Sequence, residues 1–335
     1  MRVSEESTRR GGESMGVRSI AALTVLVSPW LLADQSSAQS DIPRTPWGHP
    51  DLQGVWDYRT ITPMQRPEEF GDRAYYTEEE IAELEGDAAE RYATPPDTSV
   101  DSGLVHAVYV TDPGSRVDAS GRNSLIIDPP NGRMPQYTAA AQAEQERRAT
   151  ERAAARDRGP TDLSKPWLDR PLLERCIARG FPSVMLPTLY NNNIEIVQSP
   201  GQVAIVHEMV HQTRVIPLDD REFSGIPSFL GESRGHFEGD TLVIETRNFR
   251  SEAAYRGSSE NLVVTERFKR TPEGMIDFSM TLEDEATWVS PWTIAFVMRP
   301  TGGDLYEYAC HEGNRGLQNI LENIYDAADA AASGE

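Results

Sequence analysis

One segment of the chain has the spacing of a zinc-peptidase site. It runs His207-Glu-Met-Val-His211 and matches H-E-x-x-H, in which two histidines one helical turn apart bind zinc and the glutamate acts as a base. The surrounding residues 203–218 are rich in β-branched side chains, which favour a strand. In a strand His207 and His211 would share one face, roughly 13 Å apart and too far to bind one zinc ion. Glu208 would then point to the opposite face with Arg214, and we therefore predict no metal site here.

A second set of candidate residues is spread along the later half of the chain. Carboxylates beside arginines suit general acid–base chemistry, because an arginine keeps one carboxylate ionised while an apolar wall raises the pKa of another. Glu245, Glu266 and Glu307 fall inside strand patterns, where a neutral residue would serve stability better. Such charges predict either a polar pocket or an internal network of salt bridges. The candidate catalytic residues are Glu208, Arg234, Glu238, Glu245, Glu266, Arg267, His311 and Glu312. The candidate ligand-binding residues are Trp56, Trp292, His207, His211, Arg214, Glu307 and Asn314.

Many of these charges belong to one predicted hairpin, residues 229–249. Its sequence, FLGESRGHFEGDTLVIETRNF, reads as two strands around a turn at Glu238-Gly-Asp-Thr241. Gly-Asp at the reversal supplies a residue that tolerates positive φ and a side chain that bonds its own backbone. The hairpin predicts that the candidate residues are positioned by an antiparallel sheet.

The rest of the chain after about residue 194 repeats this strand-and-turn pattern. Residues 276–283 alternate between apolar and polar side chains, which is typical of a strand with one buried and one solvated face. The predicted strands are Ile194–Gln198, Val203–Leu218, His236–Phe237, Leu242–Arg247, Leu262–Arg270, Ile276–Leu282, Thr293–Met298 and Leu305–Cys310. This series predicts a mainly β fold, a calycin- or lipocalin-like antiparallel barrel or sandwich with added helices, over residues 171–335.

Residues 39–170 are predicted to supply strands, helices and linkers that pack on this core. Gly54-x-Trp56 has the spacing of the opening strand of lipocalin-type barrels, where the indole fills one end. Thr77 and Glu80 form a capping box at the start of a helix. The other predicted elements are strands Val105–Thr111 and Ser124–Asp128 and helices Ala139–Arg158, Pro171–Ala178 and, after the sheet, Leu317–Ala332.

Residues 1–38 are predicted to be a signal peptide. Ile20–Leu32 is an apolar run too short to span a bilayer, and Met15 precedes it as a suitable start, with cleavage after Ala38. The later sequence contains no apolar segment long enough for membrane insertion, and a net charge of −21 repels nucleic acid and anionic lipid. We expect a periplasmic or secreted protein. In that compartment Cys176 and Cys310 form either one disulfide or two buried thiols that never meet.

Four segments of the chain resemble a large family of uncharacterised exported proteins common in soil bacteria. The segments are SLIIDPPNGRMP from Ser124, ERCIARGFP from Glu174, SRGHFEGDTLVIET from Ser233 and EYACHEGN from Glu307. The resemblance covers roughly residues 41–321. It implies no activity, so it assigns no role to any residue.

Two functions of different classes follow from these patterns. The first is an exported protein whose polar Glu/Arg/His pocket binds a small polar molecule, with or without transforming it, and uses no cofactor. The alternative is a non-catalytic structural or partner-binding protein, in which interior charges only fix the strand register. A zinc metallopeptidase acting through His207, Glu208 and His211 is a third interpretation, which the strand pattern disfavours.

Overall fold

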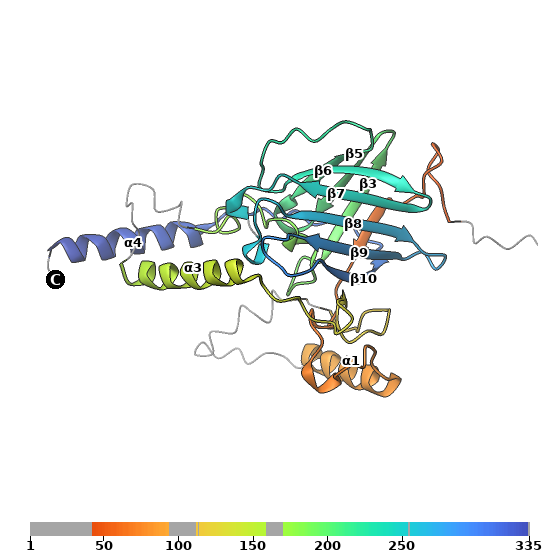
Figure 1. Cartoon of the computed structure of the whole chain (residues 1–335), viewed down its shortest axis with the longest axis horizontal. Coiled ribbons are helices and arrows are strands. Elements are labelled where there is room, and N and C mark those ends of the chain that lie inside the picture. The colour runs from red at the N-terminus through yellow and green to blue at the C-terminus, as the bar shows by residue number, and fades with distance from the viewer. Residues whose placement is uncertain (1–41, 94–111, 113, 159–169, 254, 334–335) are drawn as a thin grey trace, which may run out of the picture. The chain divides into compact units, whose positions relative to one another are not determined.

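An antiparallel sheet curls into a nearly closed, lipocalin-like barrel in this computed structural model (Figure 1). The structure describes residues 42–93, 112, 114–158, 170–253 and 255–333, which belong to one compact unit, Ser40–Glu335. The predicted signal peptide and the predicted strand Val105–Thr111 lie outside the described residues. The strands of the wall are β1 (Gly54–Asp57), β3 (Asn193–Ser199), β4 (Gln202–His207), β5 (Thr213–Pro217), β6 (Glu232–Glu238), β7 (Thr241–Arg247), β8 (Val263–Arg270), β9 (Ile276–Glu283) and β10 (Trp292–Pro300).

The strands follow one another around the wall in the order of the chain. β1 pairs with β3 on one side and with β10 on the other, so the first strand joins the two ends of the meander. β2 (Ile126–Asp128) pairs separately with β10. The two unpaired edges of this order are β5 and β6, which leaves one seam in the described wall.

The helices lie outside this series of strands, and three of the predicted helices are confirmed. The α-helices are α1 (Glu78–Ala93), α3 (Ala139–Arg158) and α4 (Arg315–Ser333). The short 3-10 turns are η1 (Glu68–Phe70), η4 (Ser183–Met185), η5 (Met209–His211), η6 (Ser251–Ala253) and η7 (Tyr255–Gly257). The capping box of α1 is also confirmed, since Glu80 N–H donates to Thr77 Oγ1 (3.2 Å) and Thr77 N–H donates to Glu80 Oε2 (2.8 Å).

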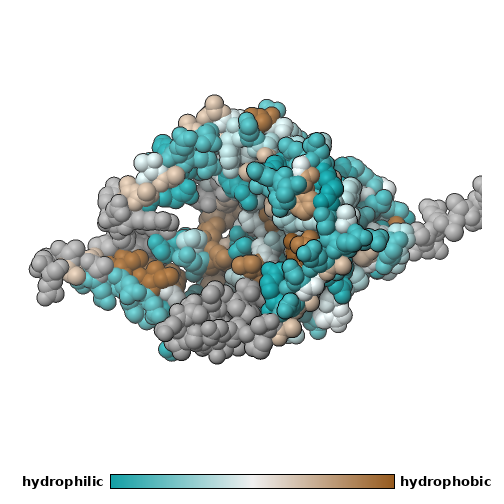
Figure 2. All heavy atoms as spheres, turned by 90° about the horizontal axis from the view of Figure 1, so that it is seen from below, coloured by the Kyte–Doolittle hydropathy of each residue, from teal (hydrophilic) through white to brown (hydrophobic). Residues whose placement is uncertain are grey.

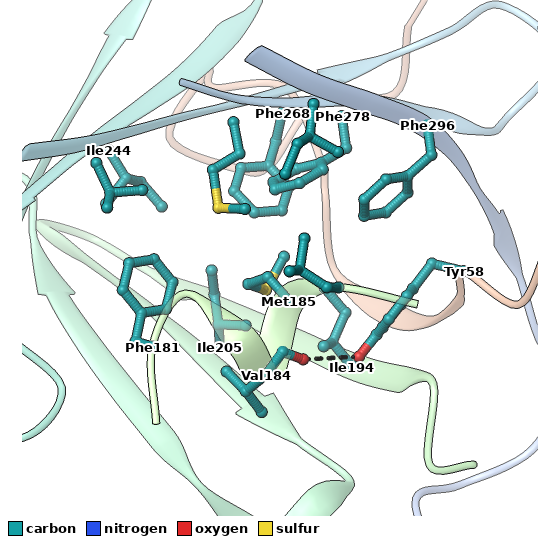
Figure 3. Close-up of a cluster of buried hydrophobic side chains, with 14 of the residues drawn as sticks. Tyr58, Phe181, Val184, Met185, Ile194, Ile205, Ile244, Phe268, Phe278 and Phe296 are labelled. Carbon is teal, nitrogen blue, oxygen red and sulfur yellow. Dashed lines mark hydrogen bonds between the residues drawn. The ribbon is translucent and has the colours of Figure 1, made fainter. Parts of the chain in front are cut away.

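Side chains fill the barrel, because the strand alternation turns large apolar residues inward. In β9 the predicted alternation is confirmed: Ile276, Phe278, Met280 and Leu282 are all buried. Figure 3 shows aromatic side chains of β8, β9 and β10 facing Met185, which lies in η4. The segment before β3 is therefore part of the core. Tyr58 ties it down by donating its hydroxyl hydrogen to the Val184 carbonyl at 2.9 Å.

The strand predicted over Val203–Leu218 is wrong as a single element. It is a hairpin of β4 and β5, and η5 forms the reversal between them. Val210 and His211 adopt left-handed conformations with φ of 60° and 40°, and His207 N–H donates to the Gln212 carbonyl at 2.9 Å. Tertiary pairing has overridden the β-preference of Val210, because β5 must return along β4 to complete the wall.

Two further predicted elements are absent from the described residues. The predicted helix Pro171–Ala178 is a series of turns. Cys176 has a φ of 53°, which a right-handed helix does not allow. The predicted strand Leu305–Cys310 is a loop and turn. β10 already pairs with β1 and β9, so that side of the wall offers no free edge for another strand.

The seam between β5 and β6 depends on a glycine. A Cβ added at Gly235 of β6 would lie 2.8 Å from Ile216 Cγ2 and 2.9 Å from Leu218 Cδ2, so the absence of a side chain lets the two edges approach. We expect Gly235→Val to lower the free energy of unfolding by about 1–3 kcal/mol through overpacking. The control is Gly302→Val, where an added Cβ meets no atom within 4 Å. Urea denaturation checks the pair, and equal stability of the two variants would contradict this account of the seam.

Candidate functional site

The candidate residues Arg214 and Glu266 form an ion pair inside the barrel. Arg214 comes from β5 and Glu266 from β8, and their side chains are 2% and 0% exposed. The contact is bidentate: Nη1 lies 3.0 Å from Oε1 and Nη2 lies 2.5 Å from Oε2. Such fork-to-fork geometry is the strongest arrangement available to these two groups.

Neutral groups from the neighbouring strands complete this pair. Arg214 Nη2 also donates to Ser233 Oγ in β6 and to Thr246 Oγ1 in β7, both at 3.2 Å, and these two hydroxyls lie 2.9 Å apart. The guanidinium carbon lies 3.8 Å from the ring centroid of Phe181, a cation–π distance. We call Arg214, Glu266, Ser233 and Thr246 the interior cluster. It is buried and its two charges pair with each other, although Arg214 Nε has no partner among the described residues, and this fits the predicted internal salt bridge better than an open polar pocket.

His207 lies in the barrel near this cluster and stays neutral. It is 1% exposed, and neither ring nitrogen has a hydrogen-bond partner among the described residues. Burial, and to a smaller extent the positive charge of Arg214, hold its pKa well below the ordinary value of 6.5. A buried neutral imidazole with no polar partner is not placed to exchange protons with a solvated substrate.

The sequence predicted that His207 and His211 share one face of a strand. In the structure they do not, because the strand ends at His207. His211 is exposed in η5, and its Nδ1 accepts a hydrogen bond from the Tyr308 backbone N–H at 3.3 Å. Glu208 does not pair with Arg214 either; its Oε2 accepts from Asn193 Nδ2 at 2.8 Å. Among the described residues, no group of three or more histidine, cysteine or acidic side chains is arranged to hold a metal ion.

Four more candidate residues lie on the outer surface of β6, β7 and β8. Glu238 pairs with Arg267 at 2.7 Å, and Glu245 pairs with Arg247 at 2.6 Å. Arg234 pairs with Glu232 and donates to backbone carbonyls of the preceding loop. The first two pairs are exposed and the third is half-buried, but all three lie on the opposite face of the wall from Glu266, so the structure does not bring them together with the interior cluster.

The two candidate tryptophans are core residues. Trp56 is 1% exposed and donates its indole N–H to the Leu52 carbonyl at 2.9 Å. Trp292 is fully buried, and its Nε1 has no hydrogen-bond partner among the residues described. The indole N–H of Trp56 thus has an acceptor within the fold, whereas that of Trp292 has none among the described residues.

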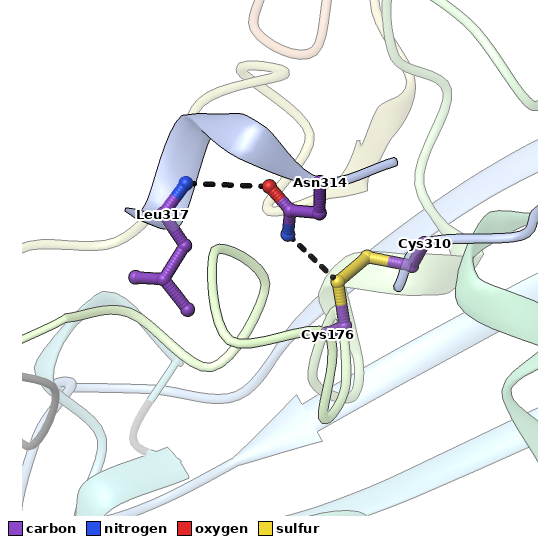
Figure 4. Close-up of a disulfide and its surroundings, with 4 residues drawn as sticks. All are labelled: Cys176, Cys310, Asn314 and Leu317. Carbon is purple, nitrogen blue, oxygen red and sulfur yellow. Dashed lines mark hydrogen bonds between the residues drawn. A yellow bond between two sulfur atoms is a disulfide. The ribbon is translucent and has the colours of Figure 1, made fainter. Parts of the chain in front are cut away.

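Of the two alternatives left open for Cys176 and Cys310, the structure has the disulfide (Figure 4). It joins the turn before β3 to the segment after β10, with Cα atoms 5.6 Å apart. Asn314 lies between this bridge and α4: its Nδ2 donates to Cys176 Sγ at 3.4 Å, and its Oδ1 accepts from Leu317 N–H at 3.3 Å. Asn314 therefore caps the first turn of α4 and holds it beside the disulfide.

A cleft of about 610 Å³ opens next to this bridge. It is lined by Leu173, Glu174, Tyr190, Glu307, Tyr308, Ala309, Cys310, Asn314, Gly316, Leu317 and Ile320. In Figure 2 hydrophobic residues, in brown, gather over the region of α4 and stand among hydrophilic residues in teal. The lining provides two carboxylates and two phenols, and none of these described residues is basic. Burial, followed by the neighbouring Tyr190, raises the pKa of Tyr308, so its phenol is neutral.

The cleft contains only part of what the sequence predicted. Of the candidates, Glu307 and Asn314 line it, whereas His311 and Glu312 are exposed in the turn between them. Glu174, Tyr190 and Tyr308 were missed. A signal was present for two of them, because Glu174 and Tyr308 each precede a cysteine by two residues and a disulfide brings such flanks together.

The comparisons with known proteins gave no match: no family model, no curated protein and no solved structure matches the chain. No helix in the described parts of the chain is long and apolar enough to cross a membrane.

The interior ion pair gives a first prediction. Arg214→Met should lower the free energy of unfolding by about 3–5 kcal/mol, because Glu266 keeps a buried charge without a partner. The double variant Arg214→Met/Glu266→Met should recover most of that loss, since two apolar side chains then replace the pair. The control is Arg267→Met, which removes a surface pair and should cost about 0–1 kcal/mol. Urea denaturation measures all three, and an Arg214→Met loss no larger than that of Arg267→Met would contradict the account.

His207 gives a second prediction, on pH. Below its ordinary pKa of 6.5 the unfolded chain binds a proton at His207 that the folded chain does not. Stability should therefore fall as the pH falls below 6.5, by up to about 1.4 kcal/mol per pH unit from this residue. His207→Leu should remove this part of the slope, and the exposed-site control His211→Gln should retain it. The test is the free energy of unfolding measured as a function of pH below 6.5. The same pH dependence in His207→Leu and in the unchanged chain would refute the prediction.

Proposed function

We propose that this protein binds a small organic cation with an apolar body in the cleft beside the Cys176–Cys310 disulfide. The observation that carries the proposal is the charge of the lining, which includes Glu174 and Glu307 and no basic side chain. Two carboxylates in a lining without a basic side chain favour a positive ligand over an anion. The positive charge of Arg179 acts on Tyr308 from outside this lining.

The other lining residues suit the same ligand. Tyr190 and Tyr308 present aromatic rings, which attract an ammonium group through their π faces. Leu173, Leu317 and Ile320 supply apolar contacts. The volume, about 610 Å³, lies within the range of clefts that hold small organic molecules.

The interior cluster supports a separate, structural role. Its charges are paired and closed to solvent, so a small ligand has no access to them inside the barrel, and we place the ligand in the cleft instead. The interior charges then serve to fix the strand register. The candidate residues that remain in the proposed binding site are Glu307 and Asn314.

We also propose that the protein is exported, and the presence of the disulfide supports this. A disulfide is typical of an oxidising compartment. Together with the predicted signal peptide, it favours a periplasmic or secreted protein. Two of the segments that resemble the exported family begin at Glu174 and Glu307, so both contribute lining residues, and we propose that the cleft is shared by that family.

The test is calorimetric titration with choline and with its neutral isostere, in which carbon replaces the ammonium nitrogen. Choline should bind, and the neutral isostere should bind roughly tenfold more weakly, because it lacks the charge that the carboxylates and aromatic rings recognise. Glu174→Gln and Glu307→Gln should each weaken choline binding.

The matched control is Glu312→Gln, because Glu312 is exposed and does not line the cleft. It should leave choline binding unchanged. Equal binding of the two ligands would reject the charge argument, and no binding of either, nor of larger ammonium compounds, would reject the proposed function.

A further inference from the structure

The apolar side of the cleft continues along α4. Leu317 and Ile320 line the cleft, and Leu321 and Ile324 follow them at the i, i+3, i+4 and i+7 spacing of one helix face. Leu317 and Ile324 project from nearly the same side of the helix, two turns apart. We call Leu317, Ile320, Leu321 and Ile324 the α4 stripe. Figure 2 shows the hydrophobic residues that gather over α4.

The α4 stripe is not part of the barrel core. Its four side chains are half-buried, and no described residue of α4 belongs to the buried core or to the apolar residues packed on it. Tyr325, at the border of the stripe, is 41% exposed. The other face of the helix carries the exposed residues Glu322, Asn323 and Asp326. A helix with two such faces is stabilised by covering the apolar one, so the stripe has contact area left for a further group.

The position of the stripe relative to the cleft is fixed at its first residue. Leu317 N–H donates to Asn314 Oδ1 at 3.3 Å, and Asn314 Nδ2 donates to Cys176 Sγ at 3.4 Å. The stripe therefore starts beside the disulfide, in the same lining that contains Glu307. From Leu317 to Ile324 the helix rises by about 10 Å. A ligand in the cleft thus meets carboxylates in one part of the lining and the start of an apolar track in another.

We propose that the ligand of the cleft is a cationic amphiphile, an ammonium head with a single alkyl chain. This inference rests on the proposed function and extends it: the head binds at the carboxylates and phenols of the cleft, and the chain lies along the α4 stripe. Continuity of the two surfaces argues for this occupant, because Leu317 and Ile320 belong to both. A second copy of the chain that covered the stripe would also cover these two lining residues.

The chemistry of the head follows from the same lining. A phosphocholine lipid would place its phosphate beside Glu174 and Glu307, where two negative charges oppose it. An ammonium head attached directly to the alkyl chain has no such group. The structure therefore favours an alkylammonium ion over a phospholipid.

The test is calorimetric titration with tetramethylammonium, butyltrimethylammonium and octyltrimethylammonium below the critical micelle concentration. Full burial of one methylene raises affinity about fourfold, and contact along one side of a helix raises it about twofold. The octyl compound should therefore bind about tenfold more tightly than the butyl compound. Octylphosphocholine should bind more weakly than octyltrimethylammonium.

Two variants separate the head from the chain. Glu307→Gln should weaken all three ammonium compounds by a similar factor. Ile324→Gln, two turns into the stripe, should weaken octyltrimethylammonium about fivefold and leave tetramethylammonium unchanged. Glutamine is a good helix former, so α4 is retained in this variant. The matched control is Asn323→Gln on the exposed face, which should change neither affinity.

Four results would overturn the inference. One affinity for all three chain lengths would mean that the chain stays in water, and the cation cleft would stand without it. An octyl affinity unchanged in Ile324→Gln would place the chain elsewhere. Octylphosphocholine binding as tightly as octyltrimethylammonium would mean a lipid headgroup. A dimer in sedimentation that Ile324→Gln dissociates would mean that a second copy covers the stripe.

Failure of the proposed function has a different signature. A gain in affinity with chain length that Glu307→Gln leaves unaltered for every compound would mean that the cleft does not recognise charge. That result would reject the cation cleft, and with it the cationic head of the ligand, although the chain lies on the α4 stripe.

Discussion

The bidentate pair of Arg214 and Glu266 is the interaction on which the closure of the barrel depends. The described wall is paired by backbone hydrogen bonds everywhere except between β5 and β6. Arg214 lies on β5, and its side chain reaches Ser233 on β6, Thr246 on β7 and Glu266 on β8. Side chains therefore cross the seam that the backbone leaves open. A shift of one residue in β8 would replace Glu266 with Thr265 or Arg267, leaving Arg214 buried without its partner, so the pair also specifies register.

The filled interior explains where ligand sites can form. A barrel of this kind can hold a ligand among its strands, but here Met185 and the aromatic rings of β8, β9 and β10 occupy that space. The cleft of about 610 Å³ lies instead beside the disulfide, where α4 begins, so a ligand there would not require the core to open.

The sequence predicted best those features that depend on neighbours along the chain. The alternation in β9, the capping box at Thr77 and the Glu238–Thr241 turn all follow from local rules and are all present. The failures depend on partners elsewhere. Val210 turns left-handed because β5 must pair with β4, and residues 305–310 form no strand because β10 is already paired. The candidate site failed for the same reason: Glu245 and Glu266 look alike in sequence, yet the pairing of Ile244 with Glu266 places them on opposite faces.

The disulfide attaches the segment after β10 to the barrel, whereas strand pairing holds the wall itself together. After β10 the chain forms no further strand among the described residues. Thr301 N–H still donates to the Val55 carbonyl of β1 at 2.9 Å. Residues 302–314 then make three contacts beside the cleft: the Cys176–Cys310 bond, the Tyr308–His211 hydrogen bond and the Asn314–Cys176 contact. A bridge across 134 residues is worth roughly 4–5 kcal/mol in the loop-entropy model, far more than either hydrogen bond. One wall of the cleft is therefore fixed to the other chiefly by a bond that persists under oxidising conditions. The cleft therefore stays assembled best in an oxidising compartment.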